Sequence, residues 1–215
     1  MWTACLLAAS IAFVPPEHRA SFKPWEHPTC WALELRSRRY PIKLSYTLGS
    51  DTAMAERVLV MLETSWRWQV DELGFLPPFP HNSDGDGFYP VYLMRGAGTG
   101  VQSGGPLNRT DVPWAAHTSY MTVDAWGHYA GDALESTIQH EFQHALQAAY
   151  DWDEPGSIFE MSANFMQEKA RPGDNGDFHL ELRDFQSSPE LPPHHFNDYA
   201  NYFMYGSSLY LFFVE

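Results

Sequence analysis

Stretches in which apolar and polar residues alternate, and stretches in which apolar residues recur with helical spacing, divide this chain into strands and helices. Alternation with a period of two predicts a strand, and apolar residues at positions i, i+3, i+4 and i+7 predict an amphipathic helix. Gly and Pro residues separate these stretches and end the elements. The predicted elements are a half-buried strand at 42–48, a helix at 52–73, strands at 88–94 and 118–124, helices at 132–150 and 157–170, and a last helix from 202 to 215.

The segments between these elements are predicted to be irregular. They comprise a lead-in segment at 17–28, a long Gly-rich loop at 96–113 and a stretch at 174–201 that contains paired prolines and paired histidines. Because the last predicted helix is still in progress at residue 215, we expect the natural chain to continue beyond it.

The composition of the chain allows a substantial core and argues against two classes of binding partner. With 215 residues, 44% of them apolar and 15% aromatic, the chain suffices for one well-buried domain or two small lobes that share a cleft. The formal net charge of −14 argues against a nucleic acid or an anionic membrane as partner, because both bind basic surfaces. An acidic surface suits cation binding, but an ordinary soluble protein also accounts for it.

The beginning of the chain predicts export. The apolar segment at 5–14 is too short to span a bilayer but has the length of the apolar region of a signal peptide, and small residues up to Ala12 fit a cleavage site. We therefore predict a signal peptide at 1–16 and a secreted or periplasmic protein. No Lys or Arg precedes the apolar run, so the alternative is a buried N-terminal element or a truncated leader. Cleavage would remove Cys5 and leave Cys30 alone, without an intrachain disulfide or a cysteine zinc site.

The predicted helix at 132–150 carries the motif H-E-x-x-H, formed by His140, Glu141 and His144. Residues four apart on a helix lie about 40° apart around its axis and one turn apart along it, so both imidazoles face one point. Glu141 lies about 100° round from His140, where it reaches a metal-bound water without being a ligand. An apolar stripe supports the helix independently of the motif. These features predict a zinc (Zn²⁺) site, against the alternative of a surface helix that carries the motif by chance.

A catalytic zinc ion takes three protein ligands and keeps a fourth position open for water. Glu160, sixteen residues after His144 and on the next predicted helix, is the third ligand that we expect. Ser157 and Glu160 also fit a capping box, in which Glu160 would only bond the amide at the start of its own helix. Glu168 and Asp153 are the alternative candidates for the third ligand.

The motif at 140–144, followed by Glu160, an Ala three residues later and an aromatic residue five residues later, resembles the gluzincin group of zinc metallopeptidases. Within that group it is most similar to the peptidase MA-like bacterial proteins, whose Tyr-x-x-Ser-Leu/Phe helix is echoed at 205–209. Gln147 and Tyr150 stand where a metzincin would carry Gly and a third ligand, which excludes that class.

The resemblance covers about 119–215 and implies an α+β, zincin-like fold for a domain at 17–215. Such a fold has a small mixed sheet, an active-site helix and a mainly helical C-terminal lobe. The resemblance also implies that the edge strand of the sheet precedes the active-site helix, which is the position of 119–124. An extended peptide would add to that edge by backbone hydrogen bonds.

In this interpretation the protein is a zinc-dependent endopeptidase that acts on a protein or peptide substrate. Zinc lowers the pKa of its bound water to near neutrality, and Glu141 accepts the proton as general base. Tyr205 is the candidate donor to the oxyanion, with His194 or His195 next. A core aromatic residue and two solvated loop histidines are the plain alternatives for these three residues.

A ligand histidine usually donates its other N–H to a carboxylate or a carbonyl oxygen, and Asn164 or Asp132 would suit this role. Two other functions compete with the peptidase. One is a catalytically weak zincin scaffold that binds peptides or has a structural zinc ion, and the other is a zinc hydrolase of non-peptide substrates. The sequence does not predict an oligomeric state.

Overall fold

The computed structural model describes residues 33–81, 85–107, 114–127, 131, 133–170, 178–195 and 202–214. The predicted signal peptide at 1–16, both cysteines and Asp132 lie outside the described residues. Within the described part of the chain, no helix is long and apolar enough to cross a membrane.

Among the described residues, five strands form one mixed sheet in the order β1-β2-β3-β5-β4. β2 (Ile42–Tyr46), β3 (Tyr89–Leu93) and β5 (His117–Val123) run parallel in its centre. β1 (Leu33–Arg36) and β4 (Gly100–Pro106) are the edge strands, and each pairs antiparallel with its neighbour. A mixed sheet packed against helices agrees with the expected α+β class at a coarse level.

The predicted positions of the central strands are confirmed to within a few residues, but two predictions about the sheet's edge are wrong. β4 lies inside the stretch at 96–113 that was expected to be a loop. Glycine lowers strand propensity, and pairing with β5, which no local pattern encodes, holds these residues extended. The segment at 119–124 is not an edge strand, because β5 lies between β3 and β4.

β2 is buried along its whole length and is not half-buried as its alternation predicts. Ile42 and Leu44 face the core, and Lys43 on the other face pairs with Asp86 of the loop before β3 at 2.8 Å. This ion pair allows the loop to cover a polar position that the sequence pattern assigns to solvent.

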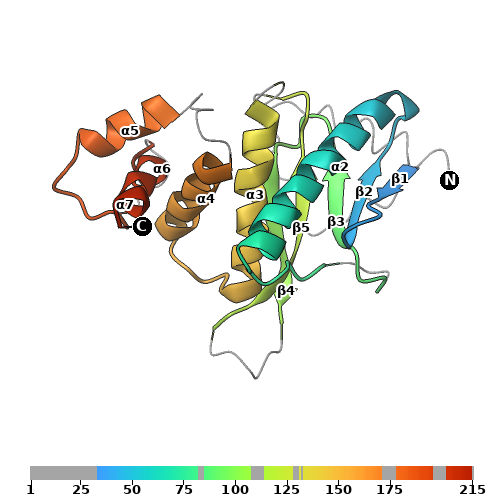
Figure 1. Cartoon of the computed structure of the whole chain (residues 1–215), viewed down its shortest axis with the longest axis horizontal. Helices are drawn as coiled ribbons and strands as arrows, with labels where there is room; N and C mark the ends of the chain where they lie inside the picture. The colour runs from blue at the N-terminus through green and yellow to red at the C-terminus, as the bar shows by residue number, and fades with distance from the viewer. Residues whose placement is uncertain are drawn as a thin grey trace.

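α2 (Thr52–Trp66) and α3 (Ala133–Tyr150) lie side by side across one face of the sheet (Figure 1). A 3₁₀ turn (Gly49–Asp51) leads into α2, and a π-helical segment (Arg67–Glu72) continues it. The apolar sides of both helices and the strand residues beneath them form the core, which includes the fully buried Val58, Leu62, Met121, Ile138 and Phe142. Burial of each such side chain contributes about 1.5–3 kcal/mol, so α3 is anchored on the sheet along its apolar side.

The remaining described helices lie on the side of α3 away from α2, and the first of them packs directly on α3 (Figure 1). They are α4 (Gly156–Ala170), α5 (Phe178–Gln186), α6 (Phe203–Gly206) and α7 (Ser208–Val214). The segment at 174–201 is predicted to be irregular, and this prediction is wrong for α5. A tertiary contact holds this helix in place: the rings of Phe185 on α5 and Phe203 on α6 have centroids 5.2 Å apart. The single helix predicted at 202–215 is instead two short helices, α6 and α7, which are separated by Ser207.

A turn at 151–155 reverses the chain and brings α4 back along α3. The carboxylate of Asp151 accepts the backbone N–H of Asp153 at 3.1 Å and that of Ala115 at 3.3 Å. The N–H of Trp152 donates to the carbonyl oxygen of Ala115 at 2.8 Å. Because Ala115 lies two residues before β5, these bonds attach the turn to the sheet and fix where α4 begins.

Candidate metal centre

α3 brings His140 and His144 together on the face that α4 covers. The two rings meet edge to face, with centroids 4.7 Å apart, and their Nε2 atoms are 3.1 Å apart. Both side chains are nearly enclosed, with about one tenth of each exposed. Helical geometry alone accounts for this pairing, because residues four apart lie one above the other.

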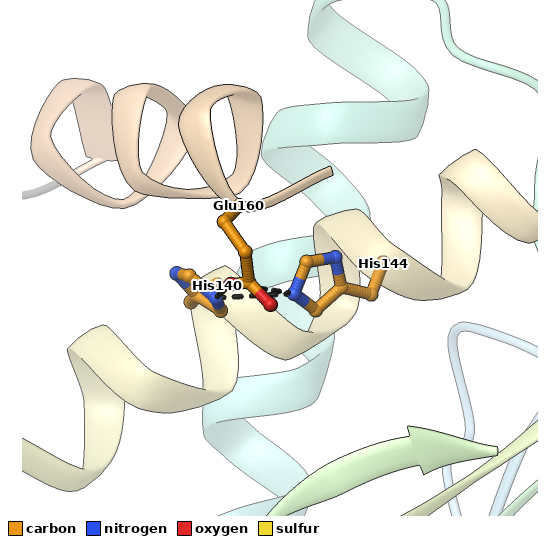
Figure 2. A group of neighbouring side chains, drawn as sticks. All are labelled: His140, His144 and Glu160. Carbon is orange, nitrogen blue, oxygen red and sulfur yellow. Dashed lines mark hydrogen bonds and ion pairs between the residues drawn. The ribbon is translucent and has the colours of Figure 1, made fainter. Parts of the chain in front are cut away.

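Glu160, on the first turns of α4, completes the group (Figure 2). Its Oε2 lies 3.1 Å from Nε2 of His140 and 3.5 Å from Nε2 of His144. The carboxylate is therefore directed at the histidines and not at the start of its own helix. The three side chains form a group that could hold a metal ion.

The charges of the group favour a cation. Burial raises the pKa of Glu160, but hydrogen bonds and positive charge from His140 and His144 outweigh it and hold that pKa well below its usual range. Burial lowers the pKa of His144, but its hydrogen bond to Glu160 and the charge of Glu141 outweigh this effect and raise the pKa. An ionised carboxylate thus lies within a mostly enclosed site, where opposite charge interacts strongly.

Two aromatic rings flank the histidines. Tyr205 of α6 stacks on His140 with centroids 6.1 Å apart and planes at 29°, and Phe159 of α4 stacks on His144 with centroids 5.8 Å apart and planes at 23°. These rings restrict the rotation of both imidazoles. Tyr205 therefore lies next to the group, although this position does not test the donor role expected for it.

Glu141 lies between this group and the edge of the sheet. Burial raises its pKa, whereas the charges of His144 and His140 and a hydrogen bond from the backbone of Val101 lower it, and the net direction is upward. The carboxyl group of Glu141 thus interacts both with the two histidines and with the backbone of β4.

The other candidate residues do not join the group of His140, His144 and Glu160 among the described residues. Asp153 is exposed in the turn before α4, and Glu168 is buried two turns beyond Glu160. His194 is exposed and accepts a hydrogen bond from Ser157 only through its backbone oxygen, and His195 packs edge to face on Phe203.

Sequence reasoning misses Gln147, whose Oε1 lies 2.7 Å from Nδ1 of His144. Its position three residues after His144 on α3 is the signal that identifies it, since residues three apart are neighbours on a helix. Asn164, one of the two candidates for orienting a ligand histidine, donates through Nδ2 to the backbone oxygen of Tyr205 at 3.3 Å. Asn164 thereby holds α6 against α4.

No protein-family model, curated protein or solved structure matches the chain.

Proposed function

We propose that the protein is a zinc-dependent endopeptidase in which His140, His144 and Glu160 hold the metal and Glu141 is the general base. The spacing of the three ligand atoms carries this proposal. Ligand atoms bound to a tetrahedral zinc ion at about 2.0–2.2 Å are separated from one another by about 3.3–3.6 Å. The corresponding separations here are 3.1, 3.1 and 3.5 Å.

The donor set supports zinc over the common hard cations. Calcium and magnesium take oxygen ligands, whereas two imidazole nitrogens and one carboxylate suit zinc. Among the described residues, no fourth His, Cys, Asp or Glu belongs to the group. Three protein ligands are typical of a catalytic zinc site, whereas a structural site is closed by a fourth.

A zinc ion bound here would supply a Lewis acid and a water with a pKa near neutrality. The carboxylate of Glu141 accepts the proton of the attacking water and passes it to the leaving amine. Burial moves the pKa of Glu141 upward, in the direction that suits a residue that both accepts and returns a proton. The hydroxyl group of Tyr205 donates a hydrogen bond to the developing oxyanion.

The substrate is a protein or peptide that lies along β4. In the zincin-like arrangement that the motif suggests, an extended peptide adds to the edge strand, and the edge on this side of the sheet is β4 and not 119–124. Because the backbone of Val101 on β4 hydrogen-bonds Glu141, a peptide paired with β4 passes close to the general base.

The test is zinc content together with casein hydrolysis, on wild type, Glu141→Gln and Glu154→Gln. Glu154 is the matched control, because it is an exposed glutamate in the turn after α3. We expect one zinc ion per chain in all three proteins, and hydrolysis that is lost in Glu141→Gln and kept in Glu154→Gln.

Other results of this experiment would favour one of the two competing functions. Zinc bound without cleavage of casein or of a peptide library would favour a zincin-type binding module, and turnover of simple esters alone would favour a non-peptide hydrolase. A folded protein that binds no zinc would exclude both zinc hydrolases and a structural zinc ion.

A further inference from the structure

Gln147 connects the two helices that carry the candidate ligands. Its Oε1 lies 2.7 Å from Nδ1 of His144 on α3. Its Nε2 lies 2.6 Å from Oγ of Ser162 and 3.2 Å from the backbone oxygen of Phe159, both on α4. One amide group thus contacts a metal-ligand histidine on one side and the helix of Glu160 on the other.

The partners of Gln147 determine which way its amide faces. The carbonyl oxygen of Phe159 only accepts hydrogen bonds, so the amide atom that faces it is Nε2 and not Oε1. Ser162 donates its hydroxyl hydrogen to the carbonyl oxygen of Ile158 at 2.7 Å and therefore also accepts from Gln147. Both contacts on α4 place Oε1 towards His144.

The orientation of the amide in turn determines the tautomer of His144. Because Oε1 of Gln147 only accepts hydrogen bonds, Nδ1 of His144 carries the hydrogen in this contact. The lone pair of the neutral ring is then on Nε2, the atom that lies 3.1 Å from Nε2 of His140 and 3.5 Å from Oε2 of Glu160. The nitrogen that faces the metal position is thus the one free to ligate.

We propose that Gln147 is a positioning residue for the metal, which holds His144 in the Nδ1–H tautomer and sets the spacing between the two ligand helices. Phe159, whose carbonyl oxygen it binds, immediately precedes Glu160, so the same side chain orients His144 and holds Glu160 in place. This inference rests on the metal function proposed above and extends it to a residue outside the H-E-x-x-H motif.

The test measures zinc affinity by competition with a chromophoric chelator, on wild type, Gln147→Leu and Gln147→Glu. Leucine removes the contact with His144 and the contacts with α4, and loss of a group that supports a metal ligand lowers metal affinity about 10- to 100-fold. Glutamate keeps an oxygen that accepts from Nδ1 but cannot donate to the carbonyl oxygen of Phe159, so we expect an affinity between those of Gln147→Leu and wild type. Gln167→Leu, the same change on α4 seven residues after Glu160, is the control and should bind zinc as wild type does.

A second readout reports the tautomer directly. In NMR spectra of the zinc-loaded protein, the Nδ1 proton of His144 should exchange slowly with water in wild type and in Gln147→Glu. It should exchange faster in Gln147→Leu, whereas a purely structural role would leave the exchange rate unchanged. If Gln147→Leu does not fold, the affinity and exchange rate of Gln147→Glu carry the test.

The outcomes separate this inference from the function on which it rests. Wild-type affinity in Gln147→Leu, or equal losses in the leucine and glutamate variants, would overturn the positioning role and leave the zinc site intact. A wild-type protein that binds no zinc would overturn the metal function itself and the role of Gln147 with it.

Discussion

The backbone N–H of Val101, on edge strand β4, donates a hydrogen bond to the carboxyl group of Glu141 on α3. Val101 lies opposite Met121 of β5 within the sheet, so β4 both pairs with β5 and contacts the proposed general base. The strand with which a substrate would pair therefore also orients the residue that would act on it.

This relationship predicts that Val101→Pro slows turnover without loss of zinc. Proline removes the N–H, and edge strands tolerate it better than central ones. A hydrogen bond to a charged group contributes about 1.5–3 kcal/mol, so kcat/KM should fall roughly 10- to 100-fold. Val101→Ala keeps the N–H and is the control. Equal activities of the proline and alanine variants at equal zinc content would contradict the role of this hydrogen bond.

Removal of the metal should destabilise the protein through the same three side chains. A ligand that binds only the folded state at 100 times its Kd adds about 2.7 kcal/mol to the free energy of unfolding. We therefore expect a chelator to lower the Tm of wild type and zinc to restore it. His144→Ala should lose this response, and His194→Ala, which alters an exposed histidine, should keep it. A Tm of wild type that does not change with zinc would contradict a metal centre at this position.

Tyr205→Phe separates a chemical role of the hydroxyl group from the packing of the ring. Loss of one oxyanion donor lowers kcat about 10²- to 10³-fold. The phenylalanine ring should still stack on His140, so zinc affinity and Tm should stay at wild-type values. Tyr202→Phe is the matched control, because Tyr202 is 51% exposed and its ring lies 6.1 Å from that of Tyr205. Unchanged kcat in Tyr205→Phe would limit this residue to packing.

The proximity of His140 and His144 is predictable because it depends only on helical geometry, whatever the rest of the chain does. Glu160 is harder to predict, since it needs α4 to fold back along α3. Hydrogen bonds between the turn and Ala115, more than thirty residues earlier, hold that reversal. Glu160 is predicted only because a catalytic zinc ion requires a third ligand, and tertiary hydrogen bonds determine its position.

The elements that the sequence analysis misses are held by partners distant in the chain. β4 is rich in glycine and extended by pairing with β5, and α5 is short and held by a contact between Phe185 and Phe203. Gln147 was predictable from its spacing to His144, but its orientation depends on Phe159 and so on the packing of α4. Local patterns therefore predict the motif better than the residues that support it.

The ion pair of Lys43 and Asp86 predicts an acid-sensitive contribution to stability away from the metal centre. Lys43 is buried in β2, and its Nζ lies 2.8 Å from Oδ2 of Asp86. Burial raises the pKa of Asp86, but the hydrogen bond from Lys43 and the charges of Lys43 and Arg36 outweigh it, so the pKa is lowered from 3.8. Because the pKa is lower in the folded state, the stabilisation is complete above the unfolded-state value and is lost as the pH falls through the folded-state value.

We therefore expect Asp86→Asn to lower the free energy of unfolding by about 1–2 kcal/mol at pH 7, because the buried Lys43 would lose its ion pair with this carboxylate. The difference from wild type should shrink as the pH falls below 3.8 and Asp86 takes up its proton in wild type as well. Urea unfolding between pH 7 and pH 3 measures both free energies, with Asp153→Asn, a change at an exposed aspartate, as the control. Parallel curves for wild type and Asp86→Asn over this range would show that the pair contributes no linkage to pH, and that Lys43 is accommodated in the sheet by other contacts.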